Sequence, residues 1–205
     1  MYYGATIWVL EENGSSVEAT GNTFNGGNAV AFSIGTGTTL TESNNTDNTT
    51  IVVAKVDGTY YTSVNEAINA AADGATVQLL SRTISEAIAP WKTDTQHTTE
   101  KSITVKGYDN FGTTLTGGLY LGYDDSQCRN HTIVVEGIAF EGKGLTVACQ
   151  KNVTIRNNTF NNITDSRAIA VIGKNIEATV KDNKIDDVQI GIELRNMVVA
   201  TMTGN

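Results

Sequence analysis

One short motif returns four times in the second half of the chain at a nearly constant spacing. Each copy is a basic residue and an asparagine, followed by a short apolar or threonine-rich segment. The asparagines of the four copies are Asn130, Asn152, Asn175 and Asn196, and the steps between them are 22, 23 and 21 residues. A period of this length is typical of a solenoid, in which each repeat forms one coil and stacks on the next.

The last three repeats also have a second asparagine, which follows the first apolar segment. These residues are Asn158, Asn183 and Asn205. Asparagine tolerates the left-handed backbone conformation of a sharp corner, and its side chain can hydrogen-bond its copy in the next coil. A further apolar segment closes each repeat. Short strands with asparagine at the corners predict an all-β, right-handed parallel β-helix of about 22 residues per coil.

Other periodic folds fit the chain less well. A leucine-rich repeat needs regularly spaced leucines and a helical segment, and a propeller blade needs about 40 residues. The chain has a single proline and many threonine, asparagine, glycine and valine residues. This composition favours strands and tight turns over helices.

The basic-asparagine corners predict a second feature. We expect Asn130, Asn152, Asn175 and Asn196 to form a structural ladder along one edge of the solenoid. Stacked asparagine amides can satisfy one another, and a basic residue beside each one keeps the edge soluble. A ligand-binding role for this edge is the alternative.

The two cysteines follow the same period. Cys128 and Cys149 are 21 residues apart, and each precedes a basic-asparagine corner by one or two residues. We therefore expect them in adjacent coils and close to each other. Two buried thiols and a disulfide between coils are both compatible with this spacing.

Residues 1–45 repeat the pattern of the C-terminal end. The segment 17–24 resembles 176–185, and 30–34 resembles 190–194. The offset is close to 160 residues in both cases. We therefore expect residues 1–45 to be the terminal coils of a preceding β-helix unit and the polar residues 46–50 to be a linker.

After this linker the sequence no longer shows the repeat pattern. Residues 51–80 contain two short apolar segments around Asp57 and Gly58, which predict a hairpin. Ser63 and Glu66 form a capping box, which predicts a short helix near residues 63–72 that covers the first coil. Residues 81–205 are then expected to form the coils of the second unit, with a long loop region over 81–129 where the period is lost.

The run from Val53 to Leu80 resembles the opening of pectin-lyase-like right-handed parallel β-helix domains in large surface proteins of Gram-positive gut bacteria. The resemblance covers 51–205 as a domain opening with its coils and 1–45 as coils of a preceding copy. It implies a secreted or cell-surface array of tandem repeats of which this chain is a fragment. It implies little about the ligand.

Members of that superfamily that cleave pectic polysaccharides use several aspartates, or a calcium cluster with a basic residue. The acidic residues of this chain do not recur one period apart: the pairs 124–125 and 186–187 occupy different places in the repeat. Neither His97 nor His131 has a neighbour of catalytic type. We therefore expect no catalytic residues, no metal and no cofactor, with a polysaccharide lyase or glycoside hydrolase as the alternative.

Charge and hydropathy argue against two classes of partner, nucleic acids and membranes. The 14 Lys and Arg residues against 22 Asp and Glu give a net charge of −8, which disfavours binding to nucleic acid. No apolar run approaches the roughly 18 residues that a spanning helix needs, so no membrane insertion is expected.

Aromatic and acidic residues gather in the predicted loop region 81–129. The candidate binding residues are Trp91, Tyr108, Tyr120, Tyr123, Asp124 and Asp125. Aromatic rings beside carboxylates suit sugars and also suit protein partners, although the same rings could simply cover the first coils. We therefore expect a non-catalytic cell-surface adhesin that recognises a glycan, a mucin or a host protein such as an immunoglobulin. A structural repeat stalk is the further alternative.

Overall fold

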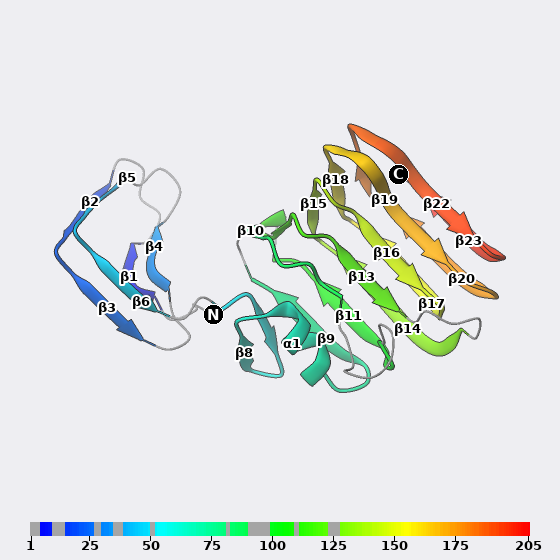
Figure 1. The fold of residues 1–205 in the computed structure, drawn as a ribbon, viewed down its shortest axis with the longest axis horizontal. Coiled ribbons are helices and arrows are strands. Elements are labelled where there is room, and N and C mark those ends of the chain that lie inside the picture. Colours follow the sequence, from blue (N-terminus) through cyan, green and yellow to red (C-terminus); the bar gives the residue numbers. More distant parts are fainter. Residues whose placement is uncertain are drawn as a thin grey trace. The chain divides into compact units, whose positions relative to one another are not determined.

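The computed structural model describes residues 5–9, 15–26, 30–34, 39–49, 52–80, 83–89, 99–108, 111–122 and 128–205. Most of the described residues lie in strands, and they contain one short helix. The chain divides into two compact units, Met1–Val52 and Val53–Asn205 (Figure 1). Each unit is a stack of coils.

Three sheets form the larger unit. Sheet I contains β7 (Ala54–Val56), β8 (Thr59–Tyr61), β9 (Ala75–Leu79), β11 (Ile103–Lys106), β14 (Arg129–Glu136), β17 (Gln150–Arg156), β20 (Ile176–Lys181) and β23 (Val198–Thr203). Sheet II contains β10 (Thr83–Ile84), β12 (Thr114–Leu115), β15 (Ala139–Glu141), β18 (Thr159–Asn161) and β21 (Lys184–Ile185). Sheet III contains β13 (Leu119–Gly122), β16 (Leu145–Ala148), β19 (Ile163–Ile172) and β22 (Val188–Arg195).

The chain passes through sheets I, II and III in turn and then begins the next coil. From β9 onward, each strand pairs in parallel with the strand one coil later, so the sheets are stacks that run from the green to the red end of Figure 1. This arrangement is a β-solenoid of about six turns with a spacing of about 24 residues. The structure therefore confirms the predicted parallel β-helix, with slightly longer coils than expected.

Equivalent inward-facing side chains stack along the solenoid and form its core. Ile103, Ile133 and Val153 occupy the same position in three consecutive turns of sheet I, and each is at most 2% exposed. In sheet II the rings of Phe140 and Phe160 stack with centroids 4.7 Å apart. Alternation along each short strand directs these residues inward, because successive side chains point to opposite faces.

The first coil is covered by the hairpin and helix that the sequence predicts. β7 and β8 are antiparallel and are joined by Asp57 and Gly58, both with positive φ, as a tight hairpin turn requires. Helix α1 (Val64–Ala70) begins after the N-cap Ser63, and its buried face contains Val64, Ala67 and Ile68.

The predicted loop region 81–129 is wrong in its middle part, because residues 103–122 form a complete coil. β11 lies between β9 and β14 in sheet I, while β12 and β13 belong to sheets II and III. The period is hidden because the equivalent residues Val77 and Val105 are 28 residues apart, and Ile103 and Ile133 are 30 apart, against 20 for Ile133 and Val153. Insertions in the connections change the spacing without removing the strands.

The predicted ladder of Asn130, Asn152, Asn175 and Asn196 is also wrong. Asn152 lies opposite Thr132 in one neighbouring strand and Glu177 in the other. A register shift between Arg129 and Thr132 adds a residue to β14 and moves Asn130 out of line. Asn175 and Asn196 are exposed corner residues with positive φ.

The smaller unit repeats the coil on a reduced scale. Its strands are β1 (Ala5–Val9), β2 (Ser16–Thr20), β3 (Thr23–Gly26), β4 (Val30–Ile34), β5 (Thr39–Ser43) and β6 (Thr46–Thr49). The parallel pairs are β1 with β4, β2 with β5, and β3 with β6. The prediction of a linker over 46–50 is therefore wrong. Residues 46–49 continue the coil as β6, and the boundary between the units follows Val52.

Candidate binding groove

A shallow groove lies where the strands of sheet III begin. Four consecutive turns contribute to it, and its volume is about 240 Å³. We call this depression the groove. It is lined by Ala87, Ile88, Ala89, Gly117, Gly118, Leu119, Tyr120, Lys143, Gly144, Thr146, Ser166 and Arg167.

Glycines allow neighbouring turns to approach closely along the groove. A Cβ on Gly117 would overlap the main-chain oxygen of Glu86, and a Cβ on Gly144 would overlap that of Arg167. Any larger residue at these positions would force the turns apart. The depression therefore depends on both glycines.

Tyr120 is the aromatic residue of the groove. Its neighbours in the strand, Leu119 and Leu121, are buried in the core, so Tyr120 occupies an outward position and is half-buried. Its backbone N–H donates a hydrogen bond to the Ile88 oxygen at 2.7 Å, which fixes β13 against the preceding turn. In the next turn the residue opposite Tyr120 is Thr146, whose side chain is polar.

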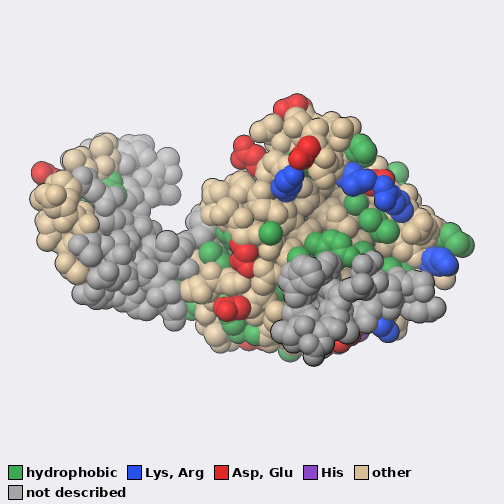
Figure 2. Space-filling model, in the orientation of Figure 1, with side chains coloured by type: hydrophobic (Ala, Val, Ile, Leu, Met, Phe, Trp, Pro, Cys, Tyr) green, Lys and Arg blue, Asp and Glu red, His purple; other side chains and the backbone are tan. Residues whose placement is uncertain are grey.

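Charged side chains lie at one end of the groove and beyond it. Lys143 Nζ donates to Asp165 Oδ2 at 2.8 Å. Arg167 and Arg195 both form ion pairs with Glu193, the second at 2.6 Å. Figure 2 shows basic and acidic side chains next to one another on the visible face of this unit.

The pKa of the Asp165 carboxyl is lowered by its partner. The hydrogen bond from Lys143 and the positive charge of that residue lower the pKa of the Asp165 carboxyl. A general acid for glycoside cleavage needs a raised pKa, so that it is protonated near neutral pH. Asp165 is therefore suited to orienting Lys143 rather than to donating a proton.

The predicted binding residues do not form one cluster in the described part of the chain. Trp91, Tyr123, Asp124 and Asp125 lie outside the described residues. Tyr120 lies in the groove, on a strand and not in a loop as predicted.

Tyr108 follows β11 instead, is half-buried, and does not line the groove. Its backbone N–H donates to Thr113 Oγ1 at 2.9 Å.

Sequence reasoning missed Lys143 and Arg167. A usable signal was present, because Lys143 and Asp165 have opposite charges and are separated by 22 residues, close to one turn of the solenoid. Positions one turn apart meet on the surface, so a search for complementary charges at that spacing would have found this pair.

Three further acidic residues near β21 do not come together. Asp182 is exposed and lies 3.4 Å from Lys181 in an ion pair, while Asp186 and Asp187 are exposed at the opposite end of β21. Within the described ranges, no three His, Cys, Asp or Glu side chains are placed to hold a metal ion.

The chain matches no protein-family model, and it matches neither a curated protein nor a solved structure. Among the described residues, no helix has the length and apolar character required to span a membrane.

Proposed function

We propose that this chain is a non-catalytic binding module that takes a glycan in the groove. The observation that carries the proposal is the combination of one outward aromatic ring with hydroxyl and basic side chains in an open depression: Tyr120, Thr146, Lys143, Ser166 and Arg167. The apolar C–H face of a sugar packs on an aromatic ring, and its hydroxyls hydrogen-bond to polar side chains at the edge.

The size and openness of the groove agree with a saccharide end or a short segment of a chain. Its volume of about 240 Å³ is below the roughly 300–1,000 Å³ of pockets that enclose a drug-sized ligand. A ligand bound here keeps much of its surface in water. We therefore expect modest affinity at a single site.

Tandem repetition supports a role in adhesion. The smaller unit carries a copy of the coil pattern at an offset of about 160 residues, so a longer array of such units would present several grooves. Linked weak sites gain avidity without new contacts. The resemblance of residues 53–80 to domains of bacterial surface proteins supports display on a cell surface, with a mucin or another glycosylated host protein as the carrier of the glycan.

A glycan-binding screen with product analysis tests this proposal. The purified chain is applied to immobilised mucins, immunoglobulins and plant and microbial polysaccharides, and the soluble fraction is analysed for released sugars. Saturable binding without released product is the expected result. Released unsaturated or reducing ends would instead support a lyase or hydrolase, and the absence of any binding would support a structural stalk.

A further inference from the structure

The two cysteines occupy consecutive turns at the corner between sheets III and I. Cys128 directly precedes β14, and Cys149 lies between β16 and β17. The residues after them, Arg129 and Gln150, are register partners. The Arg129 N–H donates to the Cys149 oxygen at 2.8 Å, so the two turns are hydrogen-bonded at this corner.

Gly173 occupies the equivalent corner in the following turn and leaves space there. The Cys149 N–H donates to the oxygen of Ile172 at 2.8 Å, which places Gly173 beside Cys149. A Cβ on Gly173 would lie 2.7 Å from Cys128 Sγ and 3.2 Å from Cys149 Cα. Cys128 Sγ and Cys149 Cα therefore both lie next to the position that a Cβ of Gly173 would occupy.

The two thiols differ in exposure. Neither cysteine forms a disulfide in the structure, and Cys149 is only 7% exposed while Cys128 is half-buried. A reagent in solution therefore reaches Cys128 first. Cys149 is shielded from reagents by its burial.

We propose that Cys128 and Cys149 are a dithiol pair that closes to a disulfide when the protein meets a small-molecule disulfide. Neighbouring strands in a sheet are about 4.8 Å apart, which lies within the roughly 4.4–6.8 Å between Cα atoms that a disulfide spans. The bond would join consecutive turns of the solenoid. This inference is independent of the groove and of the proposed function.

The chemistry proceeds by two exchanges with oxidised glutathione as the oxidant. The Cys128 thiol loses its proton to solvent, and its sulfur attacks one sulfur of the reagent, which releases one glutathione thiolate. The Cys149 thiol then loses its proton and attacks Cys128 Sγ, which releases the second glutathione. The protein loses two hydrogens, and one oxidised glutathione becomes two reduced molecules.

The test follows the intact mass of the full chain. The reduced protein is incubated with excess oxidised glutathione under native conditions, and peptide mapping then identifies linked cysteines. We expect a product that lacks two hydrogens and contains a 128–149 cross-link. Because the bond encloses a loop of about 20 residues, we expect the Tm to rise by roughly 5–10 °C and to return on reduction.

Two matched variants make the outcome decisive. Cys149→Ser is expected to stop at the glutathione adduct on Cys128, and Cys128→Ser is expected to stay unmodified while folded. The proposal is overturned if the unaltered chain keeps both thiols, if it accumulates the adduct with Cys149 still free, or if its only disulfides join two molecules.

Discussion

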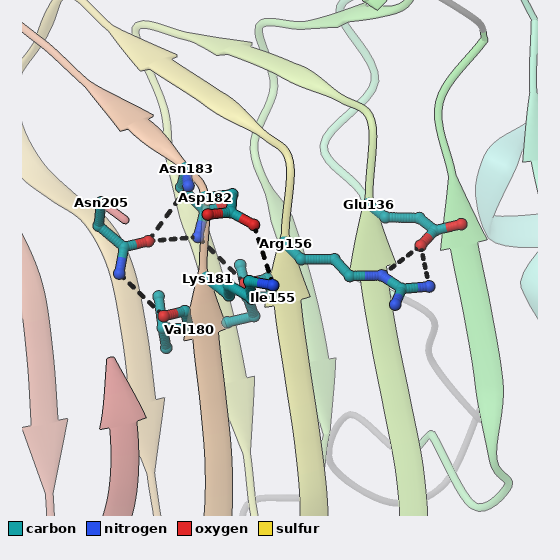
Figure 3. Close-up of polar contacts among 8 residues, drawn as sticks. All are labelled: Glu136, Ile155, Arg156, Val180, Lys181, Asp182, Asn183 and Asn205. Carbon is teal, nitrogen blue, oxygen red and sulfur yellow. Dashed lines mark hydrogen bonds and ion pairs between the residues drawn. The ribbon is translucent and has the colours of Figure 1, made fainter. Parts of the chain in front are cut away.

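At the scale of single residues, the asparagine stack contributes most clearly to the fold. The Asn158 N–H and Nδ2 both donate to Asn183 Oδ1, at 3.1 and 3.0 Å, and Asn183 repeats this pattern with Asn205 (Figure 3). Each Nδ2 also donates to a main-chain oxygen of the preceding turn, as Asn183 does to Ile155 at 3.0 Å. One asparagine side chain thus supplies hydrogen-bond partners to buried polar groups at the corner of the preceding turn and links that corner to its own.

Replacing Asn183 by alanine tests the weight of this stack. Asn183 is 2% exposed, so the change leaves the Asn158 donors and the Ile155 oxygen buried without their partner. We expect the free energy of unfolding to fall by about 2–4 kcal/mol, measured by urea denaturation. The exposed Asn161, replaced by alanine, is the matched control, and an equal loss in both variants would contradict this account.

The Lys143 and Asp165 pair predicts a pH effect. Because Lys143 lowers the pKa of Asp165, the pair stabilises the fold above the ordinary pKa of an aspartate, and this contribution is lost as the pH falls through the lowered value. Lys143→Met should raise the pKa of Asp165 toward its ordinary value. NMR titration of the carboxyl carbon measures it, with Lys184→Met as the control, and an unchanged pKa would show that the pair does not persist in solution.

At the scale of elements, the capping helix is held at both ends by charged residues from the coils. Glu86 accepts hydrogen bonds from Ser63 Oγ at 2.6 Å and from the Val64 N–H at 2.8 Å. At the other end of α1, Lys101 Nζ donates to the oxygens of Asn69 and Ala71 at 2.9 and 2.6 Å. Both charges complement the helix dipole and satisfy groups that the short helix leaves unpaired.

Glu86→Gln is expected to loosen this helix. The substitution removes the negative charge and places an NH2 group where a carboxylate oxygen accepts main-chain donors, at a cost of about 1–3 kcal/mol. Hydrogen exchange of the Ala67 and Ala71 amides should accelerate accordingly. The control is Glu66→Gln, which removes a negative charge from an exposed side chain in the first turn of α1. Comparable acceleration in this variant would mean that Glu86 acts only through its charge.

The elements also show what the sequence could predict. The period was visible where connections are short, as between β14 and β17, and the strands there were predicted correctly. It was hidden around β11 to β13, where longer connections separate equivalent residues. The stacking of Asn158, Asn183 and Asn205 was expected and is confirmed. The ladder at Asn130 fails because one extra residue in β14 shifts the register, and no spacing in the sequence marks such a shift.

The groove was predictable only in part. Tyr120 was a candidate because aromatic residues are frequent in binding sites, but the side chains around it come from three other turns. Whether these side chains lie next to Tyr120 depends on the number of residues in each connection between strands. The correct register was therefore needed before Lys143 and Arg167 could be placed beside Tyr120.

At the scale of the whole molecule, the two units are built on the same plan. Asn22 and Asn45 form the same contact as Asn183 and Asn205: Nδ2 to Oδ1 is 3.1 Å in the first pair and 2.8 Å in the second. Asn45 Nδ2 donates to the Ala19 oxygen as Asn205 Nδ2 does to that of Val180. The sequence similarity between the two units thus extends to the hydrogen bonds that their asparagines form.

The larger unit should fold without the smaller one. Residues 53–205 contain the capping helix, the described core and the groove. A chain restricted to these residues should melt in one cooperative transition, with a Tm within a few degrees of the corresponding transition of the full chain. Calorimetry measures both, and a broad or absent transition would contradict the independence of the units.

A titration of matched variants shows whether the groove around Tyr120 binds a glycan. With a glycan identified by the screen, isothermal titration compares the unaltered chain, Tyr120→Ala and the control Tyr108→Ala, after circular dichroism has shown that all three are folded. Loss of the ring should weaken binding about tenfold or more in Tyr120→Ala and leave Tyr108→Ala unchanged. An unchanged Kd in Tyr120→Ala would show that the glycan binds outside the groove.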